Sequence, residues 1–324
     1  MRLRILMNDI AAGAASDGAC GSAAGGALEE LREASLQGVA CVHGLSIYAE
    51  TTNHTLLVDT GQDGRTWDNA AALGVSLADV GAVIVSHGHY DHSGGVMRFA
   101  AGNPEAPIYL NDKAGGDYWN LRDGATERDG ARYIGIDRAI LSLPQTRLLP
   151  GDRVTDIFGD GEVVVFGGAT GRRLWPEGNR VLARRTEDGF IQDTFDHEQY
   201  VVLRDAGRTV LLGGCAHNGL LNILDRFHEL FSGWPDAVVS GFHMMKQGAY
   251  TDAETATIRE TAEELAKLPI LYFTGHCTGL PAYEIMRPIL GEALYYFGSG
   301  EEIVVREKGG KTACPAGAGE KTKH

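Results

Sequence analysis

Four side chains that commonly bind metal ions fall within six consecutive positions of this sequence. In the stretch SHGHYDHSGG they are His87, His89, Asp91 and His92, and two glycines follow shortly after. An apolar, β-branched run (AVIV) comes directly before, so the cluster begins where a predicted strand ends. Side chains two positions apart point to one side at a strand end, which lets His87 and His89 reach one cation. The following turn would direct Asp91 and His92 toward a second cation. Mixed imidazole and carboxylate ligands suit zinc, iron or manganese.

Three later segments place histidine or cysteine after an apolar strand and beside glycine. They are GGCAHNG with Cys215 and His217, SGFHMMK with His243, and TGHCTG with His276 and Cys277. The first cluster has too few ligands to surround two cations. We therefore expect these strand ends to supply the others.

Taken together, these motifs resemble the metallo-β-lactamase fold superfamily, whose HxHxDH signature is complete here. The stretches HGLSIYAE, DTGQDG, HEQYVVL, GCAHNGLLNIL, GFHMM and GHCTG are similar to one branch of it, named after the dihydropterin aminobenzene ribofuranosyl phosphate synthase. The resemblance covers roughly residues 1–305 as one domain. It implies an α/β fold, an αββα four-layer sandwich with two metals at one edge of its two sheets.

The resemblance also implies roles for the clustered residues. His87 and His89 would hold the first metal, Asp91 and His92 the second, and His276 would supply the final ligand. Asp91 would in addition be the catalytic group, orienting the nucleophilic water or accepting its proton.

Two ligand positions depart from the usual superfamily pattern, which has a histidine before one strand and a bridging aspartate after the next. His197 in DHEQ matches the first position, as a ligand or as the partner of a ligand. GGCAH matches the second, so Cys215 or His217 stands where an aspartate is usual. We favour His217, because Cys215 follows the strand directly and can pack as a small hydrophobic residue. A thiolate ligand at Cys215 is the alternative.

Four further residues are assigned by the same resemblance. Asp59 in VDTG would lie behind the site and orient a ligand imidazole, although an aspartate before Thr-Gly also caps turns. His243 would contact the substrate rather than a metal, and Lys246 would neutralise an anionic group beside it. His43, in the branch motif VHGLS, would be placed similarly to His243.

The predicted chemistry needs two divalent metal ions, with zinc as the first choice and iron or manganese as alternatives. Such a pair lowers the pKa of a water molecule and stabilises charge on a phosphoryl or acyl group. We predict a metal-dependent hydrolase of a small, phosphorylated ester. The alternative is a transferase, in which the metals hold a pterin pyrophosphate that an aminobenzene ribose phosphate attacks. A di-iron redox protein would carry a glutamate in place of His89, and a non-catalytic metal-binding module would not require the full ligand set.

The elements that must position these residues alternate along the chain as strands and helices. Strands are expected around the turn at 51–54 and at APIYLND, RAILSLP, EVVVFGG, QYVVLRD, RTVLLGG, DAVVSGF and ILYFTG. Helices are expected at DNAAALGVS, GGVMRFAAG, GLLNILDRFHELF and DAETATIRETAEELAKL. Residues 112–135 are expected to form a long loop, 11–27 a Gly/Ala-rich insertion followed by a short helix, and 306–324 a disordered tail.

Composition narrows the partners and the compartment. With 29 Lys+Arg against 43 Asp+Glu, the formal net charge is −14, which argues against binding of nucleic acid or an anionic membrane. The expected partner is therefore a small-molecule substrate, anionic and neutralised locally by the metals. Five scattered cysteines without a CxxC pair indicate reduced thiols in the cytoplasm, and no apolar run is long enough to cross a membrane. The sequence leaves the oligomeric state open.

Overall fold

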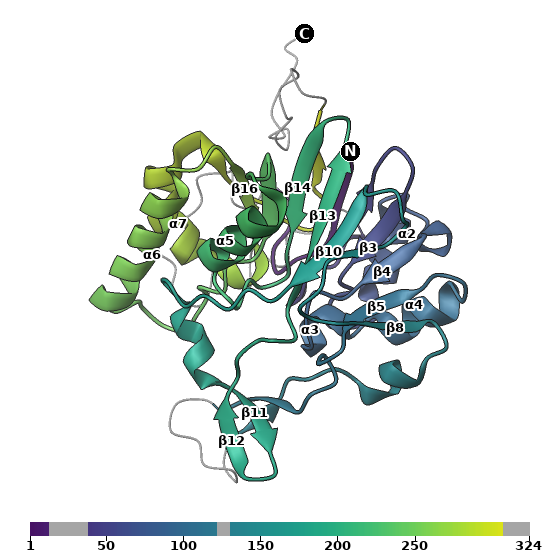
Figure 1. Cartoon of the computed structure of the whole chain (residues 1–324), viewed down its shortest axis with the longest axis horizontal. Helices are drawn as coiled ribbons and strands as arrows, with labels where there is room; N and C mark the ends of the chain where they lie inside the picture. Colours follow the sequence, from purple (N-terminus) through teal and green to yellow (C-terminus); the bar gives the residue numbers. More distant parts are fainter. Residues whose placement is uncertain (13–37, 122–129, 307–324) are drawn as a thin grey trace.

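Two seven-stranded sheets pack face to face and form the centre of the molecule (Figure 1). The computed structural model describes residues 1–12, 38–121 and 130–306. One sheet has the strand order β18-β1-β2-β3-β4-β5-β8, and the other has the order β17-β16-β15-β14-β13-β10-β9. Helices α5, α6 and α7 cover the second sheet on the left of Figure 1, and α2 and α4 cover the first sheet on the right. The predicted αββα sandwich is confirmed.

The first sheet and its helices come from the N-terminal half and from the last described strand. Their bounds are β1 (Arg2–Met7), β2 (Ser46–Glu50), β3 (Thr55–Val58), α2 (Arg65–Ala72), β4 (Ala82–Ile84), α3 (Tyr90–Ser93), α4 (Val96–Gly102), β5 (Ile108–Asn111), β8 (Thr146–Leu149) and β18 (Glu302–Val304). The short strands β3, β4 and β5 are apolar apart from Thr55 and Asn111 at their ends, because both of their faces are covered.

The second sheet and its helices follow in the C-terminal half. Their bounds are β9 (Thr155–Asp156), β10 (Val163–Gly167), β13 (Gln199–Asp205), β14 (Arg208–Leu212), α5 (Leu220–Phe231), β15 (Ala237–Ser240), α6 (Asp252–Leu265), β16 (Leu271–Thr274), α7 (Leu280–Leu290) and β17 (Leu294–Tyr296). Helix α6 begins with a capping box between Thr251 and Glu254, which satisfies backbone N–H groups that the first turn leaves unpaired.

Apolar side chains fill the three spaces between the four layers. Ile47 and Val58 from the first sheet pack with Val201 and Phe273 from the second in the central layer. Separate clusters lie beneath α5, α6 and α7 and beneath α2 and α4. Each fully buried aliphatic side chain contributes roughly 1.5–3 kcal/mol relative to exposure, so the two sheets form a firm base for the loops at their edge.

Strand direction brings the chemically active segments to one edge of the sandwich. Strands β3 and β4 are parallel, and so are β14, β15 and β16. The carboxyl ends of parallel strands meet at the same edge, where ligand sites of α/β sheets commonly lie. Asp59 follows β3, His87 lies shortly after β4, and Cys215, His243 and His276 lie after β14, β15 and β16.

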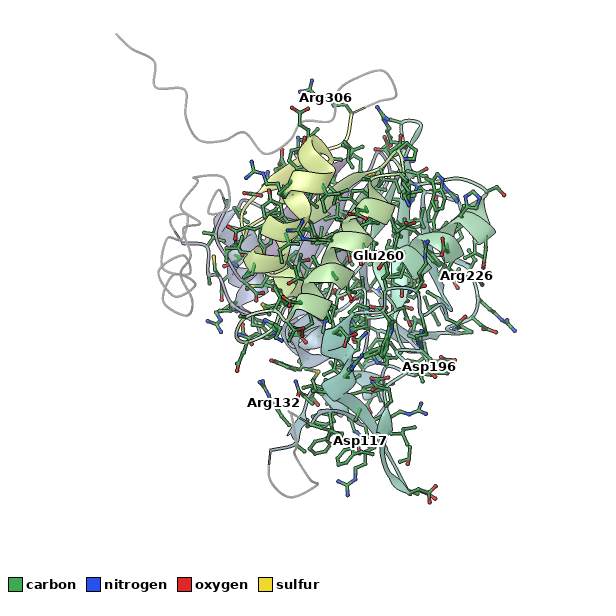
Figure 2. The ribbon with its side chains drawn as sticks, turned by 90° about the vertical axis from the view of Figure 1, so that its left-hand side faces the viewer. Asp117, Arg132, Asp196, Arg226, Glu260 and Arg306 are labelled. Carbon is green, nitrogen blue, oxygen red and sulfur yellow. The ribbon has the colours of Figure 1, made fainter. Side chains whose placement is uncertain are left out.

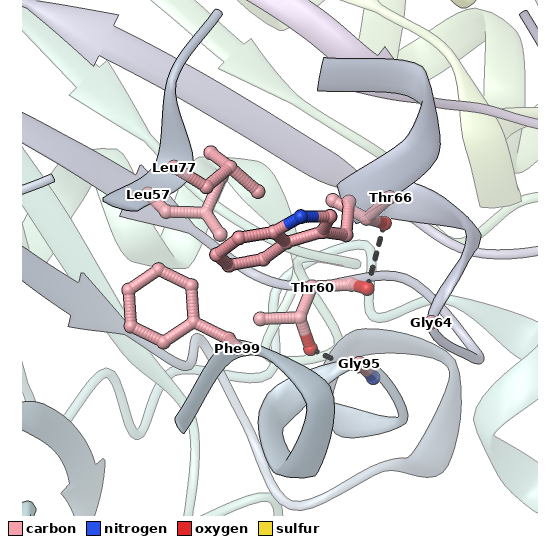
Figure 3. A pocket seen from close by; sticks show the side chains of 8 residues that line it. Leu57, Thr60, Gly64, Thr66, Leu77, Gly95 and Phe99 are labelled. Atoms are coloured by element: carbon pink, nitrogen blue, oxygen red, sulfur yellow. Dashed lines mark hydrogen bonds between the residues drawn. The ribbon is translucent and has the colours of Figure 1, made fainter. Parts of the chain in front are cut away.

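Gly94 allows the loop after β3 to pack closely against the helix that carries Asp91 and His92. A Cβ atom at Gly94 would lie only 1.9 Å from the carbonyl oxygen of Gln62. Behind this contact, the hydroxyl of Thr60 accepts a hydrogen bond from the Gly95 N–H at 3.1 Å, and its carbonyl accepts one from Thr66 at 2.7 Å (Figure 3). The glycines after the histidine cluster therefore serve close packing.

We expect a Gly94→Ala variant to lose about 3 kcal/mol of unfolding free energy, the upper part of the range for overpacking. Chemical denaturation measures this loss. Gly233→Ala is the matched control, since among the described residues its added Cβ would meet only the Phe231 carbonyl oxygen, at 4.0 Å. Equal stability of the two variants would contradict the packing described for Gly94.

Two sequence-based expectations about local structure are wrong. Residues Arg138–Ser142, in the predicted strand RAILSLP, form a 3₁₀ helix. The predicted long loop at 112–135 contains β6 (Tyr118–Asn120) and β7 (Arg132–Tyr133), which join β11 (Leu182–Thr186) and β12 (Gly189–Gln192) in a four-stranded sheet. This small sheet projects from one end of the molecule, where Asp117 and Arg132 are labelled in Figure 2.

Several other expectations lie outside the described residues. These are nearly all of the 11–27 insertion, the short helix expected after it, and the 306–324 tail apart from Arg306. Within the described ranges, no helix has both the length and the apolar character needed to cross a membrane.

Candidate metal centre

Three buried histidines converge at the edge where the strands end. His87, His89 and His217 offer ligand atoms that all lie within 4.8 Å of one another. The Nε2 atoms of His87 and His217 are 3.3 Å apart. Burial lowers the pKa of His87 and His217 well below the usual value, and burial together with the nearby His197 lowers the pKa of His89 to about 3. Neutral imidazoles are the form that binds metal ions.

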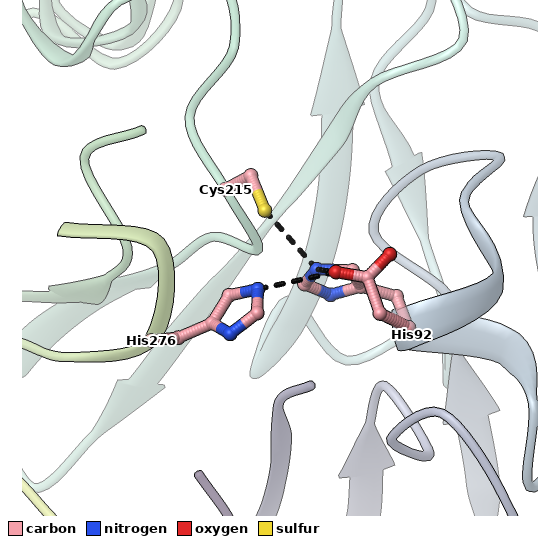
Figure 4. A group of neighbouring side chains, drawn as sticks. His92, Cys215 and His276 are labelled. Atoms are coloured by element: carbon pink, nitrogen blue, oxygen red, sulfur yellow. Dashed lines mark hydrogen bonds and ion pairs between the residues drawn. The ribbon is translucent and has the colours of Figure 1, made fainter. Parts of the chain in front are cut away.

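A second, mixed group lies beside the first and contains Asp91, His92, Cys215 and His276 (Figure 4). The Cys215 thiol is 3.1 Å from His92 Nε2. Asp91 Oδ2 lies 3.5 Å from His92 Nε2 and 3.3 Å from His276 Nε2. The His87 and His92 rings are 4.2 Å apart between centroids, so the two groups are immediate neighbours.

Asp59 lies behind the second group and contacts the far side of one imidazole. Its Oδ2 atom is 2.6 Å from His92 Nδ1, which leaves His92 Nε2 facing Cys215. Ser86 donates its hydroxyl and its backbone N–H to the same carboxylate, and its hydroxyl also lies 2.8 Å from His87 Nδ1. Carboxylates in this position fix the orientation and tautomer of metal-binding histidines. This is the placement expected for Asp59.

Asp9 plays the corresponding part for the last histidine, and the sequence analysis missed it. Its Oδ1 atom is 2.8 Å from His276 Nδ1, and its Oδ2 atom is 2.9 Å from His43 Nδ1. His43 in turn places Nε2 3.4 Å from Asp91 Oδ2, so it lies at the centre rather than merely nearby. A signal was present, because Asn8 and Asp9 follow the first strand directly, and β1 points the same way as β3.

His197 lies behind the three-histidine group and is not one of its members. Its Nδ1 atom accepts a hydrogen bond from the Gly88 N–H at 3.0 Å, and its Nε2 atom is 3.2 Å from Asp193 Oδ2. Both ring nitrogens thus have protein partners, and the ring supports the backbone between His87 and His89. Asp193, like Asp9, is a buried carboxylate that was not among the residues predicted from the sequence.

The ligand groups that contain His217 and Cys215 differ from those favoured from the sequence. His217 lies with His87 and His89, in the place expected for His197. Cys215 lies with Asp91 and its neighbours, in the place for which His217 was favoured. Between them, Ala216 has φ 54, a left-handed conformation, and the ligand atoms of Cys215 and His217 also lie within 4.8 Å of each other and of His243.

His243 and Lys246 occupy different surroundings. The His243 ring is 4.0 Å from the His217 ring, and its Nδ1 atom is buried without a hydrogen-bond partner among the residues that the structure describes. Its backbone is strained at φ 50, as is common at functional sites. Lys246 directs its ammonium group to both carboxylate oxygens of Glu254, at 2.7 and 2.8 Å. Its contact with an anionic substrate stays a prediction.

The small sheet borders the three-histidine group. Residue His89 forms a bridge with Gly135, and the Tyr90 N–H donates to the carbonyl of Ile134 at 2.9 Å. The Tyr118 ring lies 4.0 Å from the ring of His197. The segment predicted as a loop therefore forms a wall of the site.

The charges of the site fit bound cations. The buried residues in the described part of the chain include several carboxylates but no lysine or arginine, and those at this edge are Asp9, Asp59, Asp91, Asp193 and Glu198. Buried charges are normally paired or bound to metal ions. Although burial acts in the opposite direction, Asp59 and Asp91 raise the pKa of His92 to about 10, and Asp9 raises that of His276 to about 9. Protons on these imidazoles supply positive charge beside the carboxylates, which is the charge that a bound divalent cation would provide.

Unpaired atoms support the same fit. Among the described residues, the buried Nε2 atom of His89 has no hydrogen-bond partner, which is costly for a polar atom away from water, and that of His276 has the Asp91 carboxylate at 3.3 Å. A cation between Asp91, His92, Cys215 and His276 would be bound by this nitrogen and this carboxylate together. The donor set of imidazole, carboxylate and thiol is one that zinc accepts. The residues present therefore fit two metal ions.

Comparisons with known proteins identify the family. Residues 39–272 match the family model described as the metallo-beta-lactamase superfamily. The chain is 26% identical over 264 residues to the 7,8-dihydropterin-6-methyl-4-(beta-D-ribofuranosyl)-aminobenzene-5'-phosphate synthase of Methanocaldococcus jannaschii, covering 74% of this chain and 82% of that one.

Solved structures share the fold across almost the whole chain. The crystal structure of a metal-dependent hydrolase of the beta-lactamase superfamily superposes with a TM-score of 0.71 at 24% identity, covering 95% of this chain and 100% of that chain. Zn²⁺-bound PqqB from Methylobacterium extorquens has a TM-score of 0.57 at 11% identity, covering 94% of this chain and 100% of that chain.

Proposed function

This chain belongs to the metallo-β-lactamase superfamily, and we propose that it is a binuclear metal-dependent hydrolase of a small anionic ester, phosphorylated in the form we favour. The observation that carries the proposal is the pair of adjacent ligand groups. One consists of His87, His89 and His217, and the other of Asp91, His92, Cys215 and His276.

We assign the metals to these groups by donor chemistry. Burial raises the pKa of the Cys215 thiol, so a cation beside it is needed to hold the thiolate. A thiolate favours zinc or iron over magnesium or calcium, and zinc is our first choice. When bound, two such cations lower the pKa of a water molecule and stabilise negative charge on the oxygens of the substrate.

The residues of the chain then supply orientation and proton transfer. Asp91 Oδ2 faces His43, His92 and His276 within 3.5 Å, and these neighbours keep the pKa of the carboxyl well below its usual value although burial raises it. Asp91 would hold the attacking water toward the substrate as a hydrogen-bond acceptor or accept its proton. His243, partly exposed beside His217, would contact the substrate.

The proposal is tested by a substrate screen with protein reconstituted with zinc. We expect hydrolysis of at least one class among phosphomonoesters, phosphodiesters, lactones and thioesters, and loss of that activity on chelation with recovery on zinc addition. Elemental analysis of the same samples should give two metal ions per chain. Activity that is unchanged after complete metal removal would contradict the proposal.

A transferase is the second candidate, favoured by the likeness to a protein named as a synthase. The same ligand groups would then hold a pyrophosphate leaving group while an amine attacks the carbon that carries it. Product analysis separates the two reactions. Release of pyrophosphate that requires an amine co-substrate supports transfer, and an alcohol or phosphate released by water alone supports hydrolysis.

A further inference from the structure

Glu198 is a buried carboxylate that binds the loop supplying one ligand to each metal group. It is 1% exposed and immediately precedes β13. Its Oε1 atom accepts a hydrogen bond from the His217 N–H at 2.7 Å. Its Oε2 atom accepts from the Asn218 N–H at 3.0 Å, the Asn218 side-chain amide at 2.9 Å and the Tyr200 hydroxyl at 2.6 Å.

The loop needs such support because its backbone is unusual. Between Cys215 and His217, Ala216 has φ 54, a conformation that costs free energy for a residue with a side chain. The N–H groups of His217 and Asn218 point inward, and among the described residues the Glu198 carboxylate accepts both. Strained backbone persists only where its surroundings fix it. Glu198 provides that fixation by accepting both N–H groups at once.

The consequence reaches both metal groups, because the loop divides between them. Cys215 lies in the group with Asp91, His217 lies in the group with His87 and His89, and the two side chains also form a group with His243. We propose that Glu198 is a positioning residue that sets the 215–218 loop for both groups, an inference that rests on the metal-binding function proposed above. Outer contacts of this kind change metal affinity by about 10- to 100-fold when removed.

Replacement by glutamine makes a specific prediction because an amide has only one acceptor oxygen. If that oxygen takes the Oε2 position, it keeps the bonds to Asn218 and Tyr200, and the amide NH₂ faces the His217 N–H. The opposite orientation places the NH₂ against two donors of Asn218 and is less favourable. Glu198→Gln should therefore disturb His217 and leave Cys215 in place, whereas Glu198→Ala should disturb both.

The test uses the full chain, stripped of metal and titrated with Co²⁺ or Zn²⁺ against a competing chelator. For Glu198→Gln we expect about 10- to 100-fold weaker binding of one metal ion, with the sulfur-to-cobalt charge-transfer band of Cys215 retained. For Glu198→Ala we expect both ions to bind more weakly and that band to diminish. Glutamine is nearly isosteric, so the first variant keeps the test open if the second does not fold.

Glu162→Gln is the matched control. Glu162 is also buried, at 9% exposure, and accepts hydrogen bonds from the backbone and side chain of Asn53. The Glu162→Gln variant should bind metal with wild-type affinity. Wild-type affinity in Glu198→Gln, or equal weakening in the control, would overturn the inference. A wild-type protein that binds no metal would instead contradict the proposed function, and the positioning role with it.

Discussion

An Asp91→Asn variant is expected to lose about 10³-fold in kcat/KM, within the 10²- to 10⁴-fold range of positioned acid–base groups. Asparagine keeps the shape of the side chain but cannot accept the proton of water, and it removes the negative charge that His43, His92 and His276 face. The comparison uses whichever ester is turned over fastest by the zinc-reconstituted protein.

Asp160→Asn is the control for this prediction. Asp160 also lies against a histidine, His54, at 2.6 Å, but it is exposed and lies among described residues outside both metal groups. It should keep wild-type activity. Thermal melts of both variants separate loss of the catalytic group from loss of the fold. Near-wild-type turnover by a folded Asp91→Asn variant would show that this carboxylate does not handle the proton.

Removal of one histidine from each group is expected to remove one metal ion at a time. His217→Ala should bind a single ion in the mixed group and keep the sulfur-to-cobalt band, because Cys215 is untouched. His276→Ala should bind a single ion in the three-histidine group. In each variant, the affinity for the lost metal ion should fall by more than about 100-fold, which is the upper end of the loss seen when a residue that only orients a ligand is removed.

Elemental analysis and cobalt spectra measure this pattern, with His228→Ala as the control. His228 lies on α5, stacks on Trp234 and contacts the Gly233 carbonyl oxygen, so its removal should leave metal content unchanged. If His217→Ala and His276→Ala each retained two ions at wild-type affinity, the assignment of these residues to the metal groups would be wrong.

Much of the fold and the local part of the site could be predicted from sequence because the signals are local. Apolar runs gave the central strands, and helical spacing gave α5 and α6. The spacing of His87, His89, Asp91 and His92 sufficed to place them together at one strand end. His276 was expected at another strand end because it follows an apolar run, and the family resemblance identified it as the final ligand.

The remaining features depend on contacts between distant segments. Cys215 and His217 flank Ala216, whose left-handed conformation has no sign in the sequence, because alanine rarely adopts it. Glu198 supports that conformation from the position just before β13, and Asp193 faces His197 from its own loop. None of these pairs has a recognisable spacing.

The small sheet was missed for the same reason. Strand β6 pairs with β11, more than 60 residues later, through Leu182–Arg184. The strands of the small sheet are short, and β7 has only two residues. A polar, Gly-rich segment of this kind is typical of a loop, and only the distant partner strand gives it regular structure.

Anomalous diffraction at the zinc edge from crystals of the reconstituted protein tests the central claim most directly. We predict two neighbouring peaks. One should lie about 2.0–2.1 Å from nitrogens of His87, His89 and His217, and the other should lie among Asp91, His92, Cys215 and His276, about 2.3 Å from the sulfur. An absence of peaks between these residues, or a single peak with His217 turned away from His87, would contradict the account.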